Sequence, residues 1–397
     1  MDITIYPRKL SGTVAAIPSK SQAHRMLICA AFADDPVTIQ CSSTNADMDA
    51  TTDCLRSIGA EIHYSQNEYY VKPVRNTPKS ADLFCKESGS TLRFLLPVCA
   101  ALGIDTTFHL EGRLPYRPLS PLWEELERMG VRLSRPTENT IRCSGKLRSG
   151  IYNIDGSVSS QYITGLLLAL TLLPGKNKLN VTGNIESRPY IRMTEETLQL
   201  FGINTENYHF HNNILRSPGT ISVEGDWSNA AFFLGAHALG NDITITGLNY
   251  SSSQGDREVV NLIKRLNDCS TISGCDTPDL IPVLAVIAGA KKGAHFENIG
   301  RLRLKESDRI ESIAAMMRAL GAKVESATDS LTISPSRYHS CIIDSCNDHR
   351  IAMAAAIAST VADGSVTILG ADCVAKSYPD FWSEFTKLGG YYEQYNR

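Results

Sequence analysis

Six segments rich in small apolar residues recur along this chain of 397 residues, and they restrict its possible folds more than any other feature. Each is long enough for a helix and is apolar nearly all round, so it requires burial inside a domain. Each precedes a short run of residues typical of a strand. The apolar segments are 26–33, 92–103, 162–173, 230–240, 280–290 and 350–362. The expected strands are 37–39, 107–110, 179–182, 243–246, 295–297 and 366–369.

A second pattern recurs the same number of times. Amphipathic segments end in a glycine at Gly59, Gly130, Gly202, Gly321 and Gly389, and Asn267 occupies the remaining position. Both residue types suit the left-handed conformation that follows a helix. Glycine after leucine is common in any α/β protein, but two independent patterns that alternate six times favour a repeat. We therefore predict six α/β units, three in each half of the chain.

The overall composition limits the number of domains and the kinds of partner. The length is typical of two or three domains. A composition of 43% hydrophobic and 20% charged residues is ordinary for a soluble protein. The net charge of -3 gives no electrostatic reason to expect a nucleic acid or a membrane as partner. Any cationic site must therefore be local.

The cysteines and the first residues indicate a cytoplasmic protein. The eleven cysteines are scattered without a CxxC pair, which favours small core residues in a reducing compartment and no zinc site. The first residues, MDITIYPRKL, lack an apolar leader, and the longest apolar segment, 162–174, is too short to cross a bilayer. We expect a cytoplasmic location unless a targeting segment was removed.

Charged residues stand where the buried helices are expected to begin. Lys20, Arg25, Arg93 and Arg350 add positive charge near helix ends that are already positive. Serine, glycine and aspartate around them are good helix caps, but capping does not explain the cations. A bound phosphate or carboxylate would explain both features. Ser21 and Arg25 are four residues apart, so one ligand can contact both.

Three further cationic stretches have the same character. Residues 301–305 alternate as expected of a strand, and a helix with an apolar stripe follows, with Glu306 and Arg309 expected on its first turn. The loop 112–118 carries Arg117, and the segment 374–379 carries Lys376. Any one of these cations could belong to a surface ion pair. As a set they favour anionic ligands, and no P-loop, GxGxxG, HExxH or GxSxG motif suggests another cofactor or chemistry.

These motifs resemble those of the 5-enolpyruvylshikimate-3-phosphate synthase family. The resemblance covers essentially the whole chain and rests on SKSQAHR, ESGSTLR, GSVSSQ, SRPYI, VEGD, PDLIP, LKESDR, NDHR and AKSYPD. It implies an α/β (α+β) fold of two similar domains, each with three βαβαββ-type units around buried parallel helices, an inside-out α/β barrel. The implied domains are 13–221, and 1–12 together with 222–397, with the active site in the cleft between them.

The resemblance also implies a reaction. The enolpyruvyl group of phosphoenolpyruvate passes to the 5-hydroxyl of shikimate 3-phosphate by addition and elimination, which releases phosphate and serves chorismate and aromatic amino-acid biosynthesis. No metal and no organic cofactor is implied. The two substrates are then the expected partners, and we expect a monomer.

Site residues follow from the resemblance, position by position. The residues implied for shikimate 3-phosphate are Lys20, Ser21, Arg25, Ser159, Ser160, Gln161, Ser187, Asp279 and Lys305. The residues implied for phosphoenolpyruvate are Lys20, Gly89, Arg117, Gln161, Arg309, Arg350 and Lys376. Asp279, Glu306 and Lys20 are implied as catalytic. We assign Asp279 to the proton of the attacking hydroxyl and Glu306 to protonation of the methylene carbon, because carboxylates among cations suit acid and base catalysis.

Two other functions remain possible at this point. A sister enzyme transfers the same group to UDP-N-acetylglucosamine, and its family usually has a reactive cysteine in the loop that corresponds to 111–118, where this chain has none. A non-catalytic repeat protein that binds phosphorylated metabolites would need the cations, but carboxylates would weaken its binding. The histidines of the motifs, His24 and His349, are expected to orient neighbours by hydrogen bonds.

Overall fold

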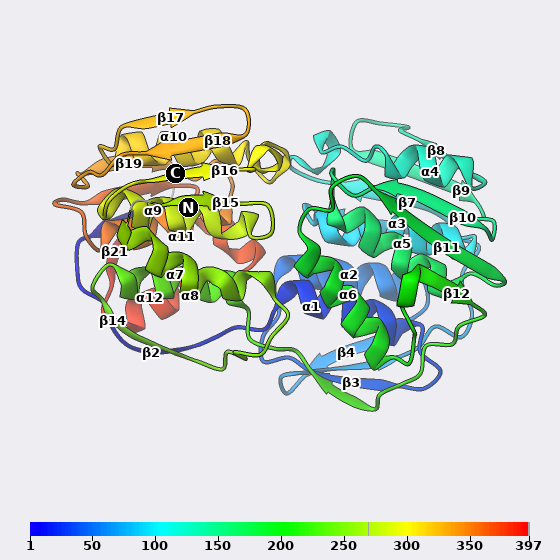
Figure 1. The fold of residues 1–397 in the computed structure, drawn as a ribbon. Coiled ribbons are helices and arrows are strands. Elements are labelled where there is room, and N and C mark those ends of the chain that lie inside the picture. Colours follow the sequence, from blue (N-terminus) through cyan, green and yellow to red (C-terminus); the bar gives the residue numbers. More distant parts are fainter. Residues whose placement is uncertain (269, 396–397) are drawn as a thin grey trace. The chain divides into compact units, whose positions relative to one another are not determined.

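The computed structural model describes residues 1–268 and 270–395. Its chain divides into two compact units. The terminal unit joins Met1–Ile17 to Glu224–Arg397, and the central unit is Pro18–Val223. The divisions follow residues 17 and 223, whereas the expected domain boundaries follow residues 12 and 221. Both units are mixed α/β structures, and Figure 1 shows helices and sheets in each.

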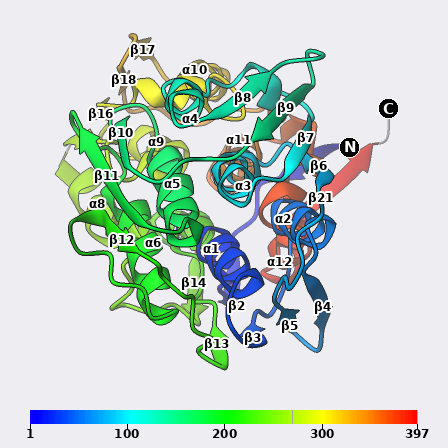
Figure 2. The ribbon, with the colours of Figure 1, turned by 90° about the vertical axis from the view of Figure 1, so that its right-hand side faces the viewer.

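Three buried helices form the core of the central unit. They are α1 (Lys20–Ala31), α3 (Gly89–Leu102) and α5 (Ser160–Leu172), and Figure 2 shows them side by side. Gly165 lets α5 approach α3 closely, because a Cβ at this position would collide with the backbone oxygen of Arg93. Most residues of both helices are accordingly buried.

Three outer helices and three sheets surround this core. Parallel strand pairs flank two buried helices, β6 and β7 around α3, and β10 and β11 around α5. The third parallel pair joins β3 to the late strand β13, which returns the chain to its start. The outer helices are α2 (Ala46–Ser57), α4 (Leu122–Arg128) and α6 (Arg188–Leu200).

The first sheet, in spatial order, is β13 (Thr220–Ser222), β3 (Val37–Gln40), β5 (Glu68–Lys72) and β4 (Glu61–Ser65). The second is β6 (Ser80–Lys86), β7 (Asp105–Leu110), β9 (Thr140–Gly145) and β8 (Val131–Ser134). The third is β10 (Ile151–Asp155), β11 (Lys176–Thr182) and β12 (His209–His211).

The terminal unit repeats this plan. Its buried helices are α7 (Trp227–Ala238), α9 (Ile281–Ala290) and α11 (His349–Ser359), and its outer helices are α8 (Val259–Arg265), α10 (Arg309–Ala319) and α12 (Phe381–Lys387). One sheet is β14 (Asp242–Thr246) parallel to β2 (Ser11–Ala15). The second is β15 (Thr271–Ser273), β16 (Ala294–Glu297), β18 (Ser330–Ile333) and β17 (Val324–Ser326). The third is β19 (Cys341–Asp344), β20 (Val366–Leu369), β1 (Asp2–Tyr6) and β21 (Tyr391–Tyr395).

The predicted helices and strands are confirmed at all six repeats. The buried helices and the strands β3, β7, β11, β14, β16 and β20 lie at the expected positions. The five helix-ending glycines have positive φ, from 79° at Gly202 to 114° at Gly130. The expectation for Asn267 was wrong, because this residue lies inside a 3-10 turn, Leu266–Asp268.

The expected strand at 301–305 was also wrong. Residues Gly300–Leu304 form a 3-10 helix. A strand would bury Leu302 and Leu304 on the same face, but Leu302 is 0% exposed and Leu304 is 42% exposed. The helical turn instead places Lys305 at its end, and α10 begins only at Arg309, so Glu306 precedes this helix and does not lie on its first turn.

The cysteines behave as expected of core residues in most positions. The described cysteines are all free thiols; Cys346 is exposed, Cys275 and Cys341 are partly exposed, and the others are buried. Cys269 lies outside the described residues. Within residues 1–268 and 270–395, no helix has the length and apolar character to cross a bilayer.

Candidate active site

In the terminal unit, the buried guanidinium of Arg309 gathers three carboxylates. Arg309 is the first residue of α10 and is 1% exposed. Its Nε donates to Asp348 Oδ2 at 2.8 Å and its Nη1 to Asp279 Oδ1 at 2.9 Å. Its Nη2 donates to Glu306 Oε2 at 2.5 Å. One side chain thus brings together both predicted catalytic carboxylates.

Asp279 is also held by two further cations. It lies in the 3-10 turn Pro278–Leu280, directly before α9. Arg350 Nη2, from the first turn of α11, donates to Asp279 Oδ2 at 2.9 Å, and Lys305 Nζ lies 3.5 Å from Oδ1. The predicted residues Asp279, Lys305, Glu306, Arg309 and Arg350 therefore form one connected cluster, which we call the ionic cluster.

The cations of the ionic cluster control the charge of Asp279. Burial raises the pKa of Asp279, but the positive charges of Arg350, Lys305 and Arg309 outweigh burial and hold that pKa below its usual range. Burial lowers the pKa of Arg309, and the charges of Asp348, Glu306 and Asp279 reverse this effect and raise it. At neutral pH, Asp279 is therefore a carboxylate and Arg309 is a cation.

Lys376 completes the set predicted in this unit. It lies at the end of the 3-10 helix Ala371–Lys376, and its Nζ donates to the backbone oxygen of Asn347 at 2.8 Å. Asn347 directly precedes Asp348, the cap of α11. Arg301, in contrast, donates to the backbone oxygen of Cys275 at 3.2 Å. Lys376 is thus attached to the loop that begins α11.

Asp348 is a central residue that the sequence argument did not assign. It is 0% exposed, caps α11 by accepting from the Arg350 backbone N–H, and also accepts from Ser307 Oγ at 3.0 Å. Two of its bonds go to Arg309, through both oxygens. The motif NDHR contained this residue, but only the fold shows that its carboxylate holds a guanidinium from another helix.

Asp256 is a second unassigned acid close to the ionic cluster. It lies in the 3-10 turn Gly255–Glu258 and is 4% exposed. Burial and the neighbouring negative charge of Asp279 raise the pKa of Asp256 to about 7. Gln254, two residues before Asp256, attaches this turn to α7, because its Oε1 accepts from the first backbone N–H of that helix, at Trp227.

The raised pKa of Asp256 predicts a dependence of stability on pH. An unfolded aspartate titrates near pH 3.9, so between about pH 4 and pH 7 the folded chain retains a proton that the unfolded chain has lost. The free energy of unfolding therefore falls as the pH rises through this window. In Asp256→Asn this contribution is removed, and we expect the variant to gain stability relative to the parent from pH 4 to 7 and no further above pH 7. Urea denaturation at several pH values measures this, and a constant difference between the two proteins would contradict it.

In the central unit, Arg25 is buried without an acidic partner among the described residues. It is 2% exposed, and its guanidinium donates to Thr194 Oγ1, Thr164 Oγ1 and the backbone oxygens of Ser21 and Tyr190. Its Cζ lies 5.1 Å from the centre of the Phe94 ring. Burial lowers the pKa of Arg25 to about 10, so it stays charged at neutral pH. A buried cation with only neutral partners suits an anionic ligand.

Lys20 begins α1 beside an acid of α2. Its Nζ donates to Asp47 Oδ2 at 2.8 Å, and the two side chains are 16% and 18% exposed. Both groups are thus partly accessible, so a ligand can reach the ammonium without unfolding the helix start. Lys20 and Arg25 belong to the same helix as Ser21, as the sequence predicted.

Two guanidinium groups lie beside Gly89, the first residue of α3. An added Cβ on Gly89 would lie 2.5 Å from Arg93 Nη1 and 2.8 Å from Arg117 Nη1. Arg93 Nη1 also donates to Gln161 Oε1 at 3.0 Å, and Gln161 Nε2 donates to Ser90 Oγ at 3.0 Å. The predicted residues Gly89, Arg117 and Gln161 are therefore together, and they are joined by Arg93, which the sequence analysis named only as a cation near a helix start.

The lack of a side chain at Gly89 has a testable consequence. Because the colliding atoms in Gly89→Ala are ends of flexible side chains, we expect the variant to fold while both guanidinium groups shift. We expect the KM for phosphoenolpyruvate to rise about ten-fold, as for a loss of about 1.4 kcal/mol in binding. The KM for shikimate 3-phosphate serves as the internal control. Equal increases in both KM values, or none, would count against this placement.

The predicted serines occupy helix starts. Ser159 caps α5 by accepting from the Gln161 backbone N–H at 3.3 Å, and Ser160 is the first residue of that helix. Ser187 precedes α6 in the left-handed conformation, with φ 53°. In this cap, Ser159 Oγ acts as an acceptor, and its hydroxyl proton can still be donated to a ligand, because a hydroxyl can donate and accept at once.

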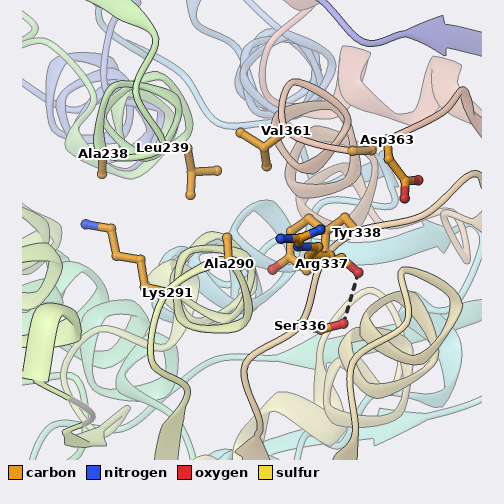
Figure 3. Close-up of a pocket in the computed structure, with 10 residues that line it drawn as sticks. Ala238, Leu239, Ala290, Lys291, Ser336, Arg337, Tyr338, Val361 and Asp363 are labelled. Atoms are coloured by element: carbon orange, nitrogen blue, oxygen red, sulfur yellow. Dashed lines mark hydrogen bonds between the residues drawn. The ribbon is translucent and has the colours of Figure 1, made fainter.

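A cavity of about 590 Å³ in the terminal unit contains none of the predicted site residues (Figure 3). It is lined by the last residues of α7 and α9, Ala238 and Ala290, and by Val361 after α11, together with Tyr338. The predicted cations Arg309 and Arg350 instead lie at the beginnings of α10 and α11. The cavity lining includes the cations Lys291 and Arg337, but it lies at helix ends, whose dipoles do not favour anions.

Comparisons with known proteins identify the family of this chain. The family described as EPSP synthase (3-phosphoshikimate 1-carboxyvinyltransferase) matches residues 5–277 and 267–385. The chain belongs to the EPSP synthase family. A 3-phosphoshikimate 1-carboxyvinyltransferase of Clostridium kluyveri is 37% identical over 99% of both chains. Another, of Clostridium acetobutylicum, is 35% identical over 98% of this chain and 97% of that one.

Solved structures of two other proteins have the same fold. An EPSP synthase of Acinetobacter baumannii matches 99% of this chain and 100% of its own, with a TM-score of 0.80 and 22% identity. The enolpyruvyl transferase NikO of Streptomyces tendae matches 99% of this chain and 98% of its own, with a TM-score of 0.78 and 17% identity. The expected mixed α/β fold with two similar parts is thus confirmed.

Proposed function

We propose that the protein transfers the enolpyruvyl group of phosphoenolpyruvate to the 5-hydroxyl of shikimate 3-phosphate and releases phosphate. Membership of the EPSP synthase family supports this reaction. The observation that carries it furthest is the ionic cluster, which combines two carboxylates with three cations around one point. A site that only bound anions would not need the carboxylates of Asp279 and Glu306.

The central unit supplies further groups for the two anionic substrates in this proposal. Arg25, Ser21, Ser159, Ser160 and Ser187 bind shikimate 3-phosphate, with Lys305 and Asp279 from the terminal unit. Gly89, Arg117, Arg309, Arg350 and Lys376 bind phosphoenolpyruvate. Lys20 and Gln161 contact both substrates. Dense positive charge is required because two polyanions repel each other in a water-poor site.

Substrate binding is expected to raise the pKa of Asp279 from its low value in the free protein. The anionic groups of phosphoenolpyruvate compete with Asp279 for Arg350 and Arg309. As these cations turn to the ligand, they hold Asp279 less, and its pKa rises toward the range that suits a general base. In the addition step, Asp279 takes the proton of the attacking hydroxyl, the hydroxyl oxygen bonds to C2 of phosphoenolpyruvate, and Glu306 delivers a proton to the methylene carbon. In the elimination step, phosphate leaves C2 and the methyl group returns a proton to Glu306, which restores the double bond.

One assay tests the proposal directly. Phosphate release from phosphoenolpyruvate is measured with shikimate 3-phosphate, with UDP-N-acetylglucosamine, and without acceptor. We expect release only with shikimate 3-phosphate, together with formation of the enolpyruvyl ether. Release only with the sugar nucleotide would assign the sister reaction. Binding of both phosphorylated substrates without release would favour a non-catalytic binding protein.

A further inference from the structure

Four buried side chains form a continuous hydrogen-bonded chain inside the central unit. His24 Nδ1 of α1 lies 2.7 Å from Thr51 Oγ1 of α2, and Thr51 Oγ1 lies 2.7 Å from Thr91 Oγ1 of α3. Thr91 Oγ1 donates to Ser88 Oγ at 2.7 Å. The four side chains are at most 1% exposed. We call this set the His24 chain.

The acceptors of Thr91 determine the direction that we infer for the other bonds of the His24 chain. A threonine hydroxyl has one proton to donate, and that of Thr91 is directed to Ser88 Oγ at 2.7 Å and the Asp47 backbone oxygen at 3.5 Å, away from Thr51. Thr51 must therefore donate to Thr91, and His24 must donate to Thr51 through Nδ1–H. The imidazole is then in its Nδ1–H tautomer, and Nε2 is an acceptor that is buried without a partner among the described residues.

His24 is a neutral donor and not a base. Burial, and then the positive charges of Lys20 and Arg25, hold the pKa of His24 well below its usual range. Its ring lies nearly perpendicular to that of Phe94, with 6.4 Å between ring centres and an interplanar angle of 88°. The side chain therefore neither takes a proton at neutral pH nor contacts solvent.

Both ends of the His24 chain lie next to predicted binding residues. His24 stands between Lys20 and Arg25 in α1. Ser88 caps α3 by accepting from the Thr91 backbone N–H at 3.3 Å, directly before Gly89. The same segment of α2 carries Asp47, which holds Lys20. The chain thus joins the beginning of α1 to the beginning of α3 through α2.

We propose that the His24 chain is a positioning network that sets the separation between the α1 residues for shikimate 3-phosphate and the α3 residues for phosphoenolpyruvate. His24, Thr51 and Thr91 are positioning residues for the reaction in this inference, which rests on the proposed function. Hydrogen bonds are directional, so they define the relative positions of the three helices more closely than apolar contacts do. This matters because small misplacements of binding groups reduce rates strongly. Stability alone does not explain an unpartnered Nε2, because a buried acceptor without a bond is unfavourable.

Two variants at His24 test whether Nδ1 is the donor that matters for the reaction. In Asn the amide nitrogen is bonded to Cγ, as Nδ1 is in histidine, whereas in Gln it lies nearer the place of Nε2. We expect kcat/KM of His24→Asn to be at least ten-fold higher than that of His24→Gln, with the difference mainly in the KM values for both substrates. Equal kinetics in the two variants would overturn the proposal.

A matched pair on α2 separates positioning from general loss of a buried hydroxyl. Thr51→Val removes the central link. Thr52→Val removes a neighbouring hydroxyl that, within residues 1–268 and 270–395, bonds only to its own helix, at the Met48 backbone oxygen. We expect Thr51→Val to lose ten-fold or more in kcat/KM and Thr52→Val to match the parent. Parent-like kinetics of Thr51→Val would contradict the proposal.

A measurement on the unaltered protein covers the case in which a variant fails to fold. In protein with ¹⁵N-labelled histidine, we expect the His24 ring to show the neutral Nδ1–H form from pH 8 to pH 5. An Nε2–H form, or protonation within this range, would overturn the network. Activity of the parent is recorded in parallel, so a failure of the proposed reaction is distinguished from a failure of this inference.

Discussion

Asp279→Asn and Glu306→Gln are each expected to lower kcat by about 10² to 10⁴-fold, the usual contribution of a positioned acid or base. Both replacements keep the shape of the side chain and remove its ability to transfer a proton. Asp279 contacts Arg309, Arg350 and Lys305, so its amide variant also releases these cations toward phosphoenolpyruvate. We therefore expect the KM for phosphoenolpyruvate to fall or stay unchanged while kcat collapses.

Asp308→Asn is the matched control for these two variants. Asp308 lies in the same segment, caps α10 by accepting from the Glu311 backbone N–H, and pairs with Arg303. Asparagine is an equally good cap, so we expect kcat within about three-fold of the parent, since a factor of three is worth only about 0.65 kcal/mol. Steady-state phosphate release checks all three proteins. A parent-like kcat of both amide variants would remove Asp279 and Glu306 from the chemistry.

Arg309→Met is expected to destabilise the protein by about 3 to 5 kcal/mol, the usual effect of removing one partner of a buried ion pair. The fully buried carboxylate of Asp348 would lose both of its bonds to the guanidinium. Asp279 and Glu306 would each lose one cation. The midpoint of urea denaturation of the full chain measures the change.

Arg303→Met provides the comparison for this loss. Arg303 also pairs with two carboxylates, Asp308 and Glu311, but its side chain is 27% exposed. Exposed pairs contribute about 0 to 1 kcal/mol, so a small change is expected. Adding Asp348→Asn to Arg309→Met is expected to recover part of the loss, because it removes the unpaired charge and keeps the cap of α11. Equal stability of the two methionine variants would contradict the role given to burial.

The repeat was predictable because its evidence is local. An all-apolar helix, a strand after it and a glycine at a helix end are each determined within a few residues by burial and by backbone conformation. All six buried helices followed from this evidence. The failure at 301–305 is also local, because alternating arginine and leucine suit both a strand and a 3-10 turn, and only the burial of Leu302 without Leu304 distinguishes them.

The sequence by itself determined the repeated helices, the charged residues at their beginnings and the resemblance that assigned those residues. Only the tertiary structure decided which charges meet. Arg309 and Asp348 are 39 residues apart and Arg25 and Thr194 are 169 apart, yet both pairs are in contact. Charge and burial act through distance in space, so the low pKa of Asp279, the raised pKa of Asp256 and the tautomer of His24 depend on neighbours that no local pattern specifies.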